Sequence, residues 1–137
     1  MSARSPRPRR TRGAAESLGS IVLGFESVIV FLAGLVAFGL RTIPAPLEQW
    51  WGVVAGSVLA VLMILTAGLL RYRWGIAVGW ALQVVLALGA ILVPAVLIVA
   101  LVFGGMWGYA TIKGAELDRR RAASNAAASS AAEANGD

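Results

Sequence analysis

Four long apolar stretches, separated by short polar interruptions, dominate the pattern along the chain. They cover residues 18–40, 50–70, 74–92 and 95–112. A helix rises about 1.5 Å per residue, so the first stretch would measure roughly 34 Å, enough to cross a hydrocarbon core of about 30 Å. The pattern predicts an all-α polytopic membrane protein, a bundle of four transmembrane helices within one domain over residues 17–112.

The third and fourth stretches form a single uncharged run from Trp74 to Ile112, which we divide at Pro94. As one helix this run would measure about 58 Å, nearly twice the thickness of the hydrocarbon core. Proline also disfavours helix at the residue before it. We therefore expect a very short turn at Pro94 between the last two helices.

Polar segments flank the apolar domain on both sides. Residues 1–16 contain five Arg and two Pro without an apolar period, so a disordered basic arm is expected there. Residues 113–121 are expected to continue the last helix as a charged turn or two. Residues 122–137 are rich in Ala, Ser and Asn without an amphipathic pattern, which favours a disordered, low-complexity tail.

Lys and Arg are distributed very unevenly between the two sides of such a bundle. The N-terminal arm, the second loop and the C-terminal segment share one side and hold eleven of these residues, whereas Arg41 stands alone on the other side. Basic residues stay in the cytoplasm, so both termini are expected to be cytoplasmic in a bacterial plasma membrane. This topology explains the net charge of +5 without a nucleic-acid partner.

Composition narrows the possible chemistry. Hydrophobic residues make up 58% of the chain and charged residues 14%, an apolar excess that a soluble domain of this size could not bury. Cys and His are both absent, which removes the usual metal ligands and the usual general base. Common catalytic templates need at least two placed polar groups, and none is visible in the spans. We expect no metal, no cofactor and no enzymatic activity.

Glu26 is the most informative polar residue because it lies inside the first apolar stretch. A carboxyl there costs about 3 kcal/mol of insertion free energy, which the surrounding large apolar side chains outweigh. Its helical face also carries Ala33 and Ala37, and small residues mark surfaces where another helix approaches. Gln83 lies on a similar face of the third stretch at a similar depth. The spacing therefore predicts a Glu26–Gln83 hydrogen bond.

Two interpretations of Glu26 remain open. A neutral Glu can hold helices together through an interhelical hydrogen bond, worth about 0.6–2 kcal/mol. Alternatively, Glu26 carries protons in a minimal proton-coupled small-molecule transporter, with Gln83 and Thr66 lining the route. Four helices leave little room for an aqueous path. The sequence therefore favours a non-enzymatic accessory or assembly component of the plasma membrane.

Glycines four residues apart predict close helix packing in three of the stretches. The pairs are Gly52 with Gly56, Gly75 with Gly79, and Gly104 with Gly108. Two small residues at this spacing share one helix face and let a second backbone approach. Packing within the chain is the simpler interpretation. A homo-oligomer seam or contact with another membrane protein is the alternative, in addition to the lipid bilayer itself.

Aromatic residues are expected at both membrane interfaces, where their amphipathic rings are most stable. Trp50 and Trp51 are assigned to the outer interface, and Trp107 is assigned with other aromatic residues to the inner one. Trp80 is too deep for an interface and is expected to pack between helices.

The segments LGFESVIVFLAGLVAFGL (23–40) and LLRYRWGIAVGWALQVVLALGAILVPA (69–95) resemble an uncharacterised family of small actinobacterial membrane proteins, domain of unknown function 4233. The resemblance covers roughly residues 17–121. It implies that Glu26 and Gln83 belong to the family pattern, and it implies no activity. The outline also resembles small multidrug transporters, which carry a Glu in the first of four helices. Those transporters that insert in both directions need a weak charge bias, unlike this chain.

Overall fold

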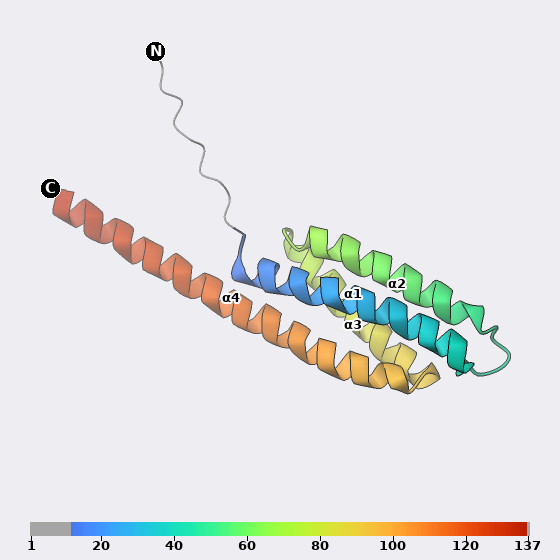
Figure 1. Cartoon of the computed structure of the whole chain (residues 1–137). Coiled ribbons are helices and arrows are strands. Elements are labelled where there is room, and N and C mark those ends of the chain that lie inside the picture. Colours follow the sequence, from blue (N-terminus) through green and yellow to red (C-terminus); the bar gives the residue numbers. More distant parts are fainter. Residues whose placement is uncertain (1–11, 137) are drawn as a thin grey trace, which may run out of the picture.

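The computed structural model describes residues 12–136 as four helices (Figure 1). They are α1 (Ala14–Leu40), α2 (Trp50–Leu69), α3 (Arg73–Leu92) and α4 (Ala95–Gly136). The described residues contain no strand, and each helix is long and apolar enough to cross a membrane. The predicted all-α fold with four candidate spans is confirmed. Most of the predicted basic arm, residues 1–11, lies outside the described residues, and α1 already begins at Ala14.

The connections between helices are short and follow local sequence signals. Between α3 and α4 the chain turns at Val93, whose backbone is extended (φ −130°, ψ 96°), and at Pro94, where the sequence predicts a break. In the loop between α1 and α2, Gln49 binds both backbone groups of Ile43. Its Oε1 accepts from the Ile43 N–H at 3.2 Å, and its Nε2 donates to the Ile43 carbonyl at 2.8 Å. One side chain thereby fixes the fold of this loop.

The disorder expected for the C-terminal tail is a wrong prediction for residues 122–136, which continue α4 as a helix. Alanine has the highest helix propensity of all residues. Helix formation is limited by nucleation, and here the membrane-spanning part of α4 already provides the nucleus. The lack of an amphipathic pattern means only that this extension packs on nothing, and its residues are exposed.

The helices form a bundle in which α1 packs against α2 on one side and α4 on the other (Figure 1). Helix α3 packs on α4, and it makes only sparse contact with α2 although the two are consecutive in the chain. The order around the bundle is therefore α2, α1, α4, α3. Helices α1 and α3 lie across the bundle from each other.

Trp107 fills the centre of the bundle near the end where α1 begins. Its side chain is fully buried, with the ring over Gly79 of α3 and within 3.2 Å of a Cβ placed on Gly19 of α1. The assignment of Trp107 to the inner interface is therefore wrong. Aromatic composition near a span end cannot distinguish an interfacial ring from a ring that enters a gap left by two glycines.

A contact between α1 and α4 closes the same end of the bundle. Gly114 of α4 lies directly against Ala15 of α1, without room for a side chain. One turn later, Asp118 accepts hydrogen bonds from the N–H groups of Ala14 (2.7 Å) and Ala15 (3.3 Å). The N-cap residue Gly13 supplies no side-chain cap. Asp118 therefore caps α1 from another helix and satisfies two of its unpaired backbone donors.

Candidate intramembrane polar site

The predicted hydrogen bond between Glu26 and Gln83 is present in the structure. Gln83 Nε2 donates to both carboxyl oxygens of Glu26, at 2.8 Å from Oε1 and 2.6 Å from Oε2. Glu26 is 0% exposed and Gln83 is 6% exposed. The pair joins α1 to α3, so it crosses the middle of the bundle.

Long side chains are needed to make this connection, because α1 and α3 do not pack directly against each other. Large apolar residues surround the pair: Leu23 precedes Glu26 by one turn, and Leu86 follows Gln83 by one turn. Both leucines belong to the buried core. A shorter polar residue at either position would leave its partner unpaired in an apolar interior, which costs about 1–3 kcal/mol.

Two buried side-chain polar atoms, one of which belongs to the pair, have no hydrogen-bond partner among the described residues. They are the acceptor Gln83 Oε1 and the donor Trp107 Nε1. Gln83 Oε1 faces α4, at 3.5 Å from a Cβ placed on Gly104. An amide has two hydrogen-bonding ends and an indole has one donor. The polar site can therefore form hydrogen bonds beyond the Glu26–Gln83 pair.

Thr66 is not joined to the pair. Its side chain is buried in α2, and its hydroxyl donates to the Leu62 carbonyl at 2.7 Å within the same helix. The hydroxyls of Ser27 and Ser57 also donate to carbonyls one turn back. A hydroxyl on an apolar helix can always use such a carbonyl. A Ser or Thr in an apolar stretch therefore does not by itself indicate that its hydroxyl lines a transport route.

Gly52 and Gly56 form the closest contact between α1 and α2. Their partner is Gly34 of α1: a Cβ placed on Gly34 would lie 2.5 Å from the Gly52 carbonyl oxygen and 3.2 Å from the Gly56 Cα. The sequence analysis missed Gly34, whose only signal is its place three residues before Ala37 on one helix face. The contact places this glycine pair at a seam within the chain.

The other two glycine pairs differ from each other. Gly79 lies under the Trp107 ring, and Gly75 lies against the backbone of Leu69 at the turn between α2 and α3. Neither leaves room for a side chain. Gly104 and Gly108 do face α3, but a Cβ on either would make ordinary contacts, at 3.5 Å from Gln83 Oε1 and 3.7 Å from the Trp80 ring. This third pair is not required for close approach.

The site offers little chemistry beyond hydrogen bonding. Within residues 12–136, no group of three or more His, Cys, Asp or Glu side chains could hold a metal ion. Neither Glu26 nor Gln83 lines any of the four best-defined cavities among these residues. As described, the pair is a closed connection between two helices.

Comparison with known proteins gives one match. The family model described as "Protein of unknown function (DUF4233)" matches residues 17–123, which include all four spans and the Glu26–Gln83 pair. No curated protein and no solved structure matches the chain.

Proposed function

We propose that this chain, which belongs to the DUF4233 family of proteins of unknown function, is a non-enzymatic accessory or assembly component of the membrane that its helices cross. The observation that carries the proposal is the complete enclosure of Glu26, held by Gln83 at 2.6 and 2.8 Å. An accessory component needs a fixed arrangement of helices, and a buried hydrogen bond across the bundle supplies one.

A carrier would need a different environment for Glu26. Alternating access requires a site that each side of the membrane reaches in turn, through the movement of one group of helices against another. Glu26 lines none of the four best-defined cavities among the described residues. Apolar core residues such as Leu23 and Met63, both 0% exposed, occupy the surrounding space. This packing supports a structural role for the pair.

The extension of α4 supports a role in assembly. Beyond the span, Gly114 and Asp118 contact the start of α1, and residues 119–136 continue as an exposed helix (Figure 1). At 1.5 Å per residue these eighteen residues reach about 27 Å from the bundle. An exposed helix of this length offers an attachment surface to a partner. We propose, from the distribution of Lys and Arg, that it lies in the cytoplasm of a bacterium, with both termini on that side.

A proton-coupled transporter remains the second candidate, and one observation favours it. Gln83 Oε1 and Trp107 Nε1 are both buried without a partner. A rearrangement that brought a polar solute or a proton carrier to Gln83 Oε1 would place it beside Glu26. The experiment must therefore separate a carboxyl that releases protons from one that only holds helices.

The test compares Glu26→Gln with Glu26→Leu in the full chain, reconstituted in vesicles with a pH gradient. We expect vesicles with wild type or with Glu26→Gln to show the same proton leak as empty vesicles. Glu26 is enclosed in wild type, and Gln at this position keeps a hydrogen bond to Gln83. Glu26→Leu should lose about 1–3 kcal/mol of unfolding free energy, since it leaves the Gln83 amide unpaired. Proton flux in wild type that Glu26→Gln abolishes would establish the transporter instead.

The assembly role is tested separately, by photocrosslinking in native membranes. A photoreactive residue replaces Ala127 on the extension, and Ile91, which is 79% exposed on α3, is the matched control within a span. We expect position 127 to give a discrete protein adduct of higher mass. Adducts from position 91 alone, or from neither position, would argue against the extension as the attachment surface.

A further inference from the structure

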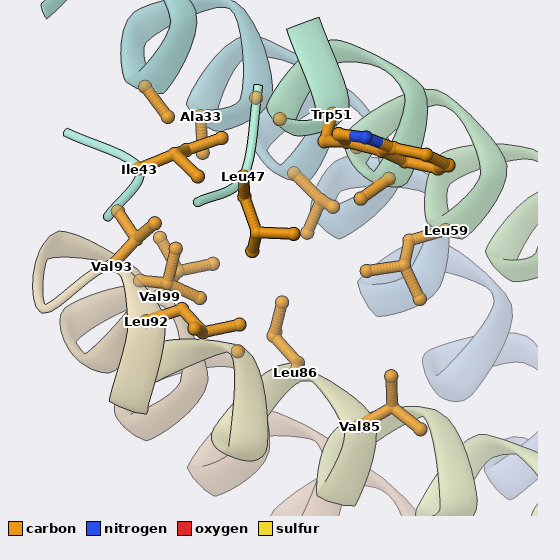
Figure 2. Close-up of a pocket in the computed structure, with 18 residues that line it drawn as sticks. Ala33, Ile43, Leu47, Trp51, Leu59, Val85, Leu86, Leu92, Val93 and Val99 are labelled. Carbon is orange, nitrogen blue, oxygen red and sulfur yellow. The ribbon is translucent and has the colours of Figure 1, made fainter. Parts of the chain in front are cut away.

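An apolar cleft separates the α1–α2 pair from the α3–α4 pair at the end of the bundle that carries the two connecting loops. We name it the loop-end cleft. Its lining consists of selected residues between 30 and 37 of α1, between 51 and 59 of α2, between 85 and 92 of α3 and between 96 and 99 of α4, with Ile43, Leu47 and Val93 from the connections. Its volume is about 260 Å³, and every lining residue is apolar or Gly. Figure 2 shows Trp51 and Leu59 facing Val85 and Leu86 across the opening.

A second apolar cavity, between α1 and α4, continues this separation. It shares Ala33, Ala37 and three valines of the α3–α4 turn with the loop-end cleft. The two cavities are therefore two sides of one gap between the helix pairs. The sequence predicts that Ala33 and Ala37 contact another helix closely. Ala37 does so, since it is buried and its Cβ lies 3.5 Å from a Cβ placed on Gly52 of α2, whereas Ala33 is only partly buried and lines the gap.

The dimensions of the cleft limit what can occupy it. Its wall on α2 extends from Trp51 to Leu59, about 12 Å along the helix, and one leaflet of hydrocarbon is about 15 Å thick. A cavity that held a helix of that length with a diameter of about 10 Å would measure roughly 500 Å³, counted to the centres of water-sized spheres. The cleft has about half of this volume. An extended hydrocarbon chain is narrow enough, and an apolar lining offers nothing to a polar headgroup.

We propose that the loop-end cleft holds one acyl chain of a phospholipid from the leaflet that faces the connecting loops. The chain enters between α2 and α3, the consecutive helices with the sparsest contact. Its end reaches Val30 and Leu86, each about one turn from the Glu26–Gln83 pair. The bound chain replaces the helix contact that Ala33 and Gly89 do not make, and it closes the apolar wall beside the polar site.

The test fills the cleft with protein instead of lipid. In Gly89→Leu the new side chain has room, because the nearest atom to a Cβ at this position is Val96 Cγ1 at 4.0 Å. Gly24→Leu is the matched control, because nothing lies within 4 Å of its Cβ and Gly24 lines none of the cavities. The full chain is reconstituted in phosphatidylcholine vesicles containing a trace of phosphatidylcholine with a diazirine near the end of one acyl chain, then irradiated.

We expect the label incorporated by wild type and by Gly24→Leu to map, by mass spectrometry, to cleft residues. Labelling of the cleft should fall at least fivefold in Gly89→Leu. Ala55→Leu fills the cleft from α2 and should give the same fall, which protects the test if Gly89→Leu does not fold. Unchanged labelling in either folded variant would overturn the proposal. So would labelling confined to outward residues such as Ile91.

Discussion

The two ends of the bundle contain similar small residues, yet a buried ring fills the centre at one end and a cleft remains at the other. At the end where α1 begins, which we call the packed end, Gly19 and Gly79 both lie against the Trp107 ring. At the loop end, Ala33 and Gly89 line a cleft of about 260 Å³. Small residues alone do not decide whether helices meet. Gly34 and Gly52 bring α1 and α2 into contact at the loop end, whereas at the packed end the Trp107 ring fills the space between α1 and α3 that Gly19 and Gly79 leave.

The largest effect on the free energy of unfolding is expected from removal of the Trp107 ring, which fills the packed end. Trp107→Ala should lower the free energy of unfolding by about 3–5 kcal/mol, because it leaves a ring-sized cavity between two glycines. The measurement is unfolding in mixed micelles, followed by circular dichroism. Trp74→Ala is the control, since Trp74 is 55% exposed on α3. Similar losses in the two variants would mean that Trp107 does not close the packed end.

Glycine substitutions at two helix contacts sharpen the comparison. Gly34→Ala should cost about 1–3 kcal/mol of unfolding free energy, because the added methyl would lie 2.5 Å from the Gly52 carbonyl oxygen. Gly104→Ala places its methyl at an ordinary 3.5 Å from Gln83 Oε1 and gains helix propensity. It should be neutral or stabilising in the same unfolding assay. If Gly104→Ala lowered the free energy of unfolding as much as Gly34→Ala, the distinction between a glycine without room for a Cβ and a glycine with room for one would be refuted.

The sequence was sufficient to predict the fold and the central hydrogen bond, for physical reasons. Each apolar stretch can cross a bilayer only as a helix, because backbone groups in lipid must form hydrogen bonds within their own segment. Glu26 and Gln83 then have few alternatives. Both are costly in lipid, and the rise per residue places them at one depth on helices that run in opposite directions.

The remaining features depend on side-chain contacts that no periodicity contains. Ala33 and Ala37 give the same small-residue signal whether the facing helix is near or far, so the loop-end cleft could not be predicted. Trp107 was assigned to the wrong place because interfacial and core rings look alike in sequence. The cap that Asp118 provides for α1 joins residues more than a hundred positions apart, and only the packing of α1 on α4 brings them together.

Removing that cap should have an intermediate effect, confined to the packed end. Asp118→Ala leaves the N–H groups of Ala14 and Ala15 without their acceptor, at a cost of about 1 kcal/mol. Hydrogen exchange at these two amides should accelerate about fivefold, while amides near Val30 keep their protection. Glu48→Ala, which removes an exposed acid at the loop end, controls for the change in charge. Unchanged exchange at Ala14 would mean that solvent satisfies the start of α1 equally well.

The smallest effect concerns the exposed charges on α4 beside the packed end. Hydrogen bonds from Lys113, at 3.1 Å, and from Arg120 hold the pKa of Glu116 below its ordinary value of 4.5. A lowered pKa in the folded state means that the carboxylate adds stability above pH 4.5, which is lost as the pH falls through the lowered pKa. The same contact raises the pKa of Lys113 above 10.5, so its contribution is lost only as the pH rises past that value.

The titration of Glu116 measures this contribution directly, because carboxyl chemical shifts report protonation of one side chain. In Lys113→Gln and in Arg120→Gln the midpoint should move up toward 4.5, with the larger shift in Lys113→Gln, whose hydrogen bond is the leading cause of the depression. Salt should have the same effect, since exposed charges are screened over about 10 Å at 0.1 M. The unfolding free energy of either variant should hardly change, because exposed ion pairs order long side chains for little gain. If Lys113→Gln or Arg120→Gln lowered the unfolding free energy as much as Asp118→Ala, the packed end would depend on the surface charges. The cap that Asp118 provides would then not be the feature that holds this end together.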